Sequence, residues 1–331
     1  MRWLARMLRR LLVVAVLLAA LVTFWPVDPL RPPAFDAAAL PEDLDSYLAA
    51  RESVFTDLTE GTAKQIVWAG VPGERTPVSI VYLHGFSATS QEIRPVPDRV
   101  AAALGANLYL ARLAGHGRDG AAMAAASADD WMTDLAESLT IGARLGDRVI
   151  VIATSTGGAL ATAGLGTPDL RTALPGADKV AGMVFVSPNY RLRSAAISRA
   201  LDLPLADRWL PLVAGASRSF AASSPEHAKY WTTQYPTAAI FPMARLMQAA
   251  RQADPATIKT PLLHIYSPDD SVVNPDAGLA ITARWGGPVK TMAYRVGPGV
   301  DPDGHVIAGD IRSPGLTAPV TTLVTDWIGG L

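Results

Sequence analysis

Cysteine is absent from the 331 residues of the chain, and histidine occurs only five times. The first absence excludes disulfides, a thiolate nucleophile and zinc sites with cysteine ligands, and it leaves the redox compartment undetermined. No two histidines are closely spaced on a predicted helix, which argues against a metal site built from histidine. We therefore expect neither a metal nor a cofactor.

Net charge is also nearly absent, because 29 Lys and Arg residues face 30 Asp and Glu residues. No basic surface that could neutralise phosphates is indicated, so we expect no nucleic-acid partner. Hydrophobic residues make up 50% of the chain and charged residues 18%. This balance excludes a disordered protein, and a chain of this length can bury one large core or two modest ones. The oligomeric state does not follow from these counts.

A long apolar run occurs at the amino terminus. Four arginines within the first ten residues precede the run from Leu11 to Trp25, and Pro26 follows it. This pattern predicts that residues 1–25 form an uncleaved signal anchor, a transmembrane helix with its arginines in the cytoplasm and the catalytic domain on the other side. The alternative is a cleaved signal peptide and a secreted protein. Residues 26–63 are predicted to form a Pro-rich tether and lead-in.

From residue 64 to residue 331, short apolar runs rich in β-branched residues alternate with segments of helical length. Runs that are apolar on both faces are typical of a parallel sheet covered by helices, so we predict an α/β fold. Residues 188–259 interrupt the rhythm without a clear strand, and we expect them to form a helical cap inserted over the sheet. The seven predicted strands are 65–70, 78–85, 106–112, 148–155, 180–188, 261–268 and 289–297.

The segment Ala153-Thr154-Ser155-Thr156-Gly157 joins a predicted strand to a predicted helix. A serine at the apex of such a turn is held above the end of the strand, and its neighbours must be small because the strand and helix approach closely. The segment fits this nucleophile elbow, with Ala153 at the position usually occupied by glycine. The alternative interpretation is a serine that only caps the helix.

Three further segments lie at the ends of predicted strands. His84, Gly85 and Phe86 follow one strand, so the N–H groups of Phe86 and Thr156 could together stabilise an oxyanion. We expect His84 to hold this loop through hydrogen bonds. Two adjacent carboxylates follow a later strand, and the loop after the last strand contains a histidine. The order serine, acid, histidine is that of one particular fold.

The chain from about residue 65 resembles an α/β-hydrolase and is similar to the bacterial carboxylesterase and monoacylglycerol lipase group. The resemblance rests on "LHGFSATS", "LAGHGRDG", "ATSTGG", and the pair "SPDDSVV" and "DGHV". It implies Ser155 as the nucleophile, His305 as the base and Asp270 as the acid, with Asp269 as the alternative acid. Gly85 and Gly157 are implied to support this site.

These residues predict a serine hydrolase that cleaves carboxylic esters of apolar or lipid-like acyl groups through an acyl-enzyme. The insertion offers aromatic and thioether side chains that suit an acyl pocket or the packing of the insertion. The candidates are Trp231, Tyr235, Phe241 and Met243. An acyltransferase on the same scaffold and a non-catalytic binding protein with this fold are the alternatives.

Overall fold

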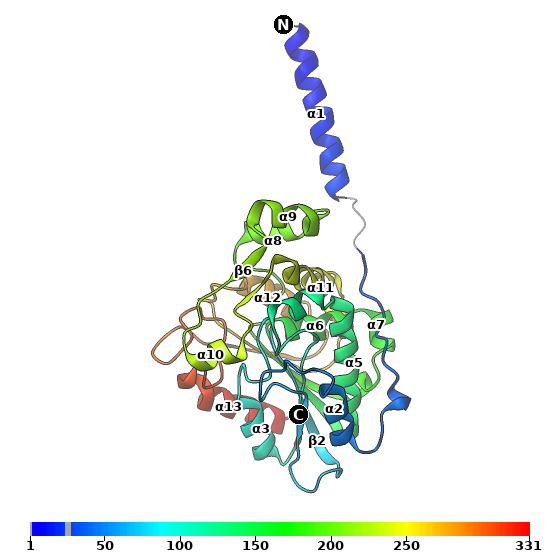
Figure 1. The fold of residues 1–331 in the computed structure, drawn as a ribbon, viewed down its shortest axis with the longest axis vertical. Coiled ribbons are helices and arrows are strands. Elements are labelled where there is room, and N and C mark those ends of the chain that lie inside the picture. Colours follow the sequence, from blue (N-terminus) through cyan, green and yellow to red (C-terminus); the bar gives the residue numbers. More distant parts are fainter. Residues whose placement is uncertain (1, 24–27) are drawn as a thin grey trace.

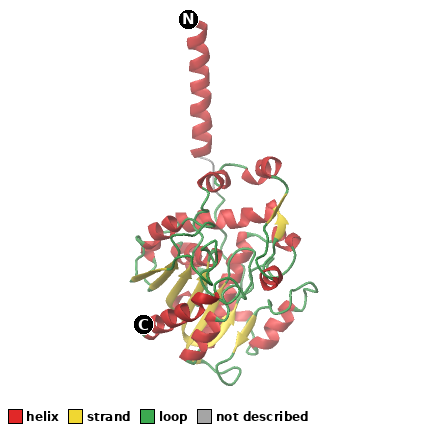
Figure 2. Cartoon of the chain, turned by 90° about the vertical axis from the view of Figure 1, so that its left-hand side faces the viewer, coloured by secondary structure: helices red, strands yellow, loops and turns green. Residues whose placement is uncertain are grey.

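The computed structural model describes residues 2–23 and 28–331. Its centre is a seven-stranded sheet in the order β1-β3-β2-β4-β5-β8-β9, which is parallel except for the antiparallel edge pair β1 and β3. Figure 1 shows the chain in sequence colours, and Figure 2 shows helices on both sides of the strands. The strands of this sheet are β1 (Gln65–Val67), β2 (Thr76–Leu83), β3 (Asn107–Leu110), β4 (Gly146–Thr154), β5 (Val180–Val186), β8 (Leu262–Tyr266) and β9 (Val289–Ala293).

The α-helices are α1 (Arg2–Thr23), α2 (Leu44–Glu52), α3 (Val96–Leu104), α4 (Gly120–Ala125), α5 (Ala128–Leu145), α6 (Thr156–Gly166), α7 (Pro168–Thr172), α8 (Ala195–Leu201), α9 (Ala206–Ala214), α10 (Pro225–Tyr230), α11 (Ile240–Gln252), α12 (Pro275–Thr282) and α13 (Pro314–Gly329). Short 3-10 helices are η1 (Ala37–Ala39), η2 (Ala177–Lys179), η3 (Thr237–Ala239) and η4 (Pro255–Thr257).

The central strand β4 explains the apolar runs of the sequence. Its odd-numbered residues from Val149 to Ala153 belong to the core cluster that contains side chains of α5, α6 and α11. Ile150 and Ile152 belong to the cluster on the other face, which contains side chains of α3 and α13. Both faces of the sheet at β4 are therefore buried, as the run of consecutive apolar residues predicts. The predicted α/β-hydrolase fold with a mostly parallel sheet is confirmed.

The insertion between β5 and β8 differs from the expectation in two respects. It contains a short antiparallel pair, β6 (Ser217–Ser219) and β7 (Gln234–Pro236), so the expectation of an insertion without strands is wrong. The pair was not visible in the sequence because each strand is three residues long and has no apolar alternation. In addition, α11 contributes buried side chains to the core beside α6, so its buried face belongs to the main helical layer.

The lead-in after residue 28 is docked on the body. Leu30, Leu40, Leu44 and Leu48 are buried in the core cluster that contains α5. The backbone N–H of Arg31 donates to Asp129 Oδ1 at 3.0 Å. The predicted tether is therefore packed against the domain through these buried leucines.

The amino-terminal segment forms the helix α1, which projects from the end of the body where α8 and α9 lie (Figure 1). Within the described ranges, no helix combines the length and the apolar character that a membrane crossing requires. The predicted transmembrane helix is therefore not shown. Residues 24 and 25, which the prediction placed at its far end, lie outside the described residues.

Candidate active site

The turn between β4 and α6 places Ser155 at a sharp corner. Its backbone adopts φ 51° and ψ −113°, a strained conformation for a residue with a side chain. A Cβ atom on Gly157 would lie 2.4 Å from the carbonyl oxygen of Leu83, so only glycine fits there. Ala153 is fully buried, and the turn forms with this alanine in the place of the usual glycine.

Ser155, His305 and Asp270 are brought together from three separate loops. Ser155 Oγ lies 3.0 Å from Nε2 of His305, and Nδ1 of the same ring lies 2.8 Å from Asp270 Oδ2. The other carboxylate oxygen of Asp270 accepts two hydrogen bonds of 2.8 Å from the N–H groups of Val272 and Val273. This arrangement fixes the carboxylate and directs Nε2 toward the serine.

Asp269, the alternative acid, lies outside this constellation. Its carboxylate pairs with Arg295 at 2.7 Å and accepts a hydrogen bond from the N–H of Val296. The structure therefore places Asp270, and not Asp269, against His305.

The charge around His305 favours its protonated form. Burial by itself lowers the pKa of this imidazole, but the carboxylate of Asp270, together with those of Glu92 and Asp301, outweighs burial and raises the pKa above its ordinary value of 6.5. A base whose cation is supported in this way can accept a proton from a serine hydroxyl.

The predicted oxyanion loop lies beside Ser155. A Cβ atom on Gly85 would be 3.1 Å from Cβ of Ser155. Within the described residues, the N–H groups of Phe86 and Thr156 form no hydrogen bond, so they are available to an incoming oxygen. His84 is buried, which lowers its pKa well below 6.5, and its neutral ring accepts from Leu113 N–H at Nε2 and donates from Nδ1 to Gly85 O. His84 thus contacts the oxyanion loop through its hydrogen bond to Gly85 O.

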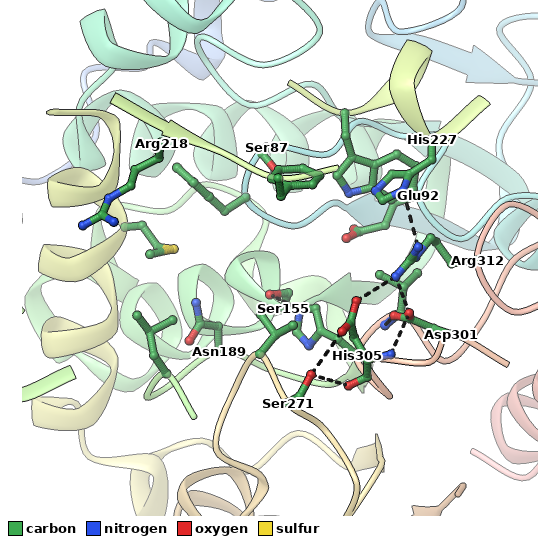
Figure 3. Close-up of a pocket in the computed structure, with 18 of the residues that line it drawn as sticks. Ser87, Glu92, Ser155, Asn189, Arg218, His227, Ser271, Asp301, His305 and Arg312 are labelled. Atoms are coloured by element: carbon green, nitrogen blue, oxygen red, sulfur yellow. Dashed lines mark hydrogen bonds and ion pairs between the residues drawn. The ribbon is translucent and has the colours of Figure 1, made fainter. Parts of the chain in front are cut away.

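A cavity of about 740 Å³ opens above Ser155 and is formed largely by the insertion (Figure 3). Trp231, Tyr235 and Met243, three of the four residues expected in an acyl pocket, line it. Phe241 does not line it and lies in a second hollow beside Asp28. The apolar residues that line the cavity are Phe86, Leu192, Ile197, Leu201, Phe220, Ala221, Trp231, Tyr235, Ile240, Met243, Val272, Pro302 and Val306.

Several polar residues of the cavity were not singled out from the sequence. Glu92 is 2% exposed, and its Oε2 accepts a 2.7 Å hydrogen bond from Gly85 N–H. Asn189 donates its backbone N–H to Ser155 O, and its side-chain oxygen has no partner among the described residues. Only the position of Glu92, eight residues after His84, could have indicated this residue from the sequence. Nothing in the sequence indicated that Asn189 would lie beside Ser155, because the fold alone brings the two together.

Asp301 and Arg312 connect the loop of His305 with the insertion (Figure 3). Asp301 accepts the N–H of Val306 at 2.9 Å and pairs with Arg312. The guanidinium of Arg312 also donates to Ser223 Oγ at 2.6 Å, next to α10. The loop that carries His305 is thus held by Asp301 within the loop and, through Arg312, by the insertion.

Comparisons with known proteins find the same fold. A lipolytic enzyme from a study of LipS and LipT, two metagenome-derived enzymes, has a TM-score of 0.64 at 20% identity over 83% of this chain and 100% of its own. A monoglyceride lipase from Saccharomyces cerevisiae has a TM-score of 0.60 at 12% identity, covering 81% and 90%. A monoacylglycerol lipase from Paleococcus ferrophilus has 0.55 at 14%, covering 80% and 96%. At these identities the likeness shows the fold alone.

No curated protein matches the sequence. The family model described as serine aminopeptidase, S33, matches residues 75–297, which is more than half of the chain and includes β2, the elbow and the acid loop. The chain therefore belongs to this S33 family of α/β-hydrolases, and the solved structures with a similar fold include lipolytic enzymes.

Proposed function

We propose that the protein is a serine hydrolase that cleaves carboxylic esters of apolar or lipid-like acyl groups. One observation carries this proposal: Ser155 Oγ, the imidazole of His305 and the carboxylate of Asp270 form a continuous chain of hydrogen bonds at the base of a largely apolar cavity. A structural role for the serine alone would need neither the histidine nor the buried acid.

The reaction follows from the positions of these atoms. His305 Nε2 accepts the proton of Ser155 while Oγ attacks the ester carbonyl carbon. The C–O bond to the alcohol then breaks, and the imidazolium returns its proton to the leaving oxygen. In the second half, a water gives its proton to Nε2 and attacks the acyl-enzyme, and the carboxylic acid leaves as Ser155 is reprotonated. Asp270 holds the imidazole in the tautomer with Nδ1 protonated throughout.

The N–H groups of Phe86 and Thr156 stabilise the negative oxygen of both tetrahedral intermediates. Loss of one such donor costs about 3 kcal/mol of barrier, or about a hundredfold in rate. His84 stabilises the oxyanion loop through its hydrogen bonds. Gly157 allows α6 to approach Leu83 O closely at the turn that carries Ser155.

The apolar lining of the cavity supports an apolar acyl group. Trp231, Tyr235 and Met243 provide the wall from the insertion side. The yeast monoglyceride lipase with a similar fold was solved in complex with a substrate analogue, and this supports the assignment of lipid-like esters to the present chain.

The proposal includes attachment to a membrane by residues 1–25, with the catalytic domain on the non-cytoplasmic side. Five apolar residues of the insertion are exposed at the end of the body from which α1 projects: Ile197 and Leu205 at 49%, Leu203 at 40%, Leu212 at 84% and Val213 at 73%. Exposed arginines accompany them on α8 and α9. An apolar patch with basic neighbours suits an anionic lipid surface.

Covalent labelling tests the catalytic assignment. The full-length protein in detergent is treated with a fluorescent fluorophosphonate, and Ser155→Ala is expected to abolish labelling. Ser271→Ala is the matched control, because Ser271 also lines the cavity but binds Asp303 O. Labelling that persists in Ser155→Ala would contradict the proposal.

Two product assays test the substrate and the alternative functions. Aryl esters of increasing acyl length should be cleaved with rising kcat/KM beyond short chains, and a monotonic fall would contradict the lipid-like substrate. Ester formation with an added alcohol, at the expense of free acid, would identify an acyltransferase. Absence of any turnover despite a labelled serine would favour a binding protein.

Vesicle flotation tests the membrane attachment. The full-length protein should float with vesicles that contain anionic lipid, and Leu212→Asp combined with Val213→Asp should reduce the hydrolysis of an ester embedded in these vesicles more than that of a soluble ester. Equal losses on both substrates would contradict the role of this patch.

A further inference from the structure

The carboxyl of Glu92 is a buried acidic group that the catalytic steps above do not use. Glu92 lies in the segment between β2 and α3 and is 2% exposed. Its Oε2 accepts hydrogen bonds from Gly85 N–H at 2.7 Å and from Tyr82 Oη at 3.1 Å. Its Oε1 forms no hydrogen bond within the described residues, and the side chain lines the cavity that contains Ser155 (Figure 3).

Gly85 links this carboxyl to the oxyanion loop. A Cβ atom on Gly85 would lie 2.7 Å from Glu92 Oε1 and 3.1 Å from Ser155 Cβ. The glycine therefore lies directly between the two side chains. The hydrogen bond to Gly85 N–H orients the His84–Gly85 peptide, which precedes the Gly85–Phe86 peptide that carries the Phe86 N–H. Glu92 thus holds one side of Gly85, while Nδ1 of His84 holds the carbonyl of the Gly85–Phe86 peptide, and the two contacts together fix the Phe86 N–H.

The loop that carries His305 packs against the same segment. A Cβ on Gly309 would lie 2.5 Å from Cα of Ile93, and Asp310 N–H donates to Arg94 O at 3.0 Å. Glu92 and His305 thus face one cavity from two segments in direct contact.

From this geometry we propose that Glu92 is a positioning residue of the site: it orients the peptide that leads to the Phe86 N–H, and its carboxylate is the second negative charge that faces the imidazole of His305. The proposal rests on the proposed function and adds to it a group outside the triad.

The charges around Glu92 determine in which direction this residue changes the pKa of His305. Burial raises the pKa of Glu92 to about 7, while the Gly85 N–H, the charge of His305 and the Tyr82 hydroxyl act in the opposite direction. His305 also faces Asp270 and Asp301. When Glu92 is ionised it stabilises the imidazolium, and as pH falls below about 7 the carboxyl takes a proton and this support weakens. The charge of each group affects the pKa of the other, so the measured midpoints belong to the pair.

Two substitutions separate the charge from the hydrogen bond. Glu92→Gln keeps an oxygen for Gly85 N–H but has no charge. We expect the acid limb of kcat/KM to move down by about one pH unit, with kcat within about threefold of the wild type. Glu92→Ala removes both, and kcat is expected to fall by a further tenfold or more with little change in KM, because a hydrogen bond to a charged group is lost.

Asp98→Asn is the matched control. It removes the charge of a carboxylate on α3, six residues after Glu92, that is partly exposed and pairs with Arg94. It should leave the acid limb in place. A purely structural role for Glu92 would lower the melting temperature of both variants without moving the limb, and that result would overturn the proposal.

Nuclear magnetic resonance gives a readout that does not require turnover. The Cε1–H signal of His305, assigned by its loss in His305→Gln, should titrate about one pH unit lower in Glu92→Gln than in the wild type. An unchanged titration would overturn the electrostatic part. If the shift occurs but Ser155 is not labelled by fluorophosphonate, the coupling stands and the proposed hydrolase function fails.

Discussion

Replacement of Asp270 by Asn tests the central geometry of the site. Oδ1 of Asp270 accepts the N–H groups of Val272 and Val273, each at 2.8 Å. In Asp270→Asn only the amide oxygen can accept these two bonds, so the amide nitrogen must face Nδ1 of His305. Two donors cannot bond to each other, and the imidazole must change to the tautomer that carries its proton on Nε2.

That tautomer cannot accept the proton of Ser155. We expect kcat to fall by about 10⁴, which corresponds to about 5 kcal/mol of barrier. The assay is the hydrolysis of a p-nitrophenyl ester at pH 8, with the melting temperature measured to show that the variant is folded. Asp269→Asn is the matched control, because this neighbouring carboxylate pairs with Arg295 at the surface, and it should change kcat by less than about threefold, as expected for a partly exposed pair. Activity of Asp270→Asn within tenfold of the wild type, or a large loss in Asp269→Asn, would refute the reasoning.

Three further predictions concern the turn, the pH profile and the buried charges. Gly157→Ala should reduce kcat and the melting temperature together, because its Cβ would lie 2.4 Å from Leu83 O; unchanged values of both would show that the corner relaxes. The acid limb of kcat/KM should have its midpoint above pH 6.5, since His305 acts as a base only when neutral and its pKa is raised in the folded protein; a midpoint below 6 would contradict this. Lys64→Met should lower the free energy of unfolding in urea by about 3–5 kcal/mol, because two buried carboxylates of α5 lose their partner, whereas Arg75→Met at an exposed pair should cost at most about 1 kcal/mol.

The sequence was sufficient to predict the seven main strands, because runs such as Val149 to Ala153 are apolar at consecutive positions only when both faces of a sheet are covered. The order of the strands across the sheet was not predictable from local patterns, since pairing joins segments far apart in the chain. The choice between Asp269 and Asp270 came from a resemblance, and the structure supplies a geometric reason for it.

Other features of the site could not be predicted. Phe241 and Met243 are two residues apart on α11, so their side chains point in very different directions from the helix, and only Met243 reaches the cavity. Glu92 was not recognised because its nearness to Gly85 depends on the path of the segment before α3. The catalytic roles of Ser155 and His305 stay predictions until labelling and kinetics are measured.

The docking of the lead-in limits how far the catalytic domain can move from its amino-terminal helix. Because the chain is packed against the body from about Asp28 onward, only the five steps from Thr23 to Asp28 separate α1 from the domain. Even a fully extended chain covers about 18 Å over five residues. Any surface that holds α1 therefore also restricts the domain to a narrow layer next to that surface. For the proposed ester hydrolase held at such a surface, the length of this linker, rather than the affinity of the cavity, would set which substrate molecules the site can reach.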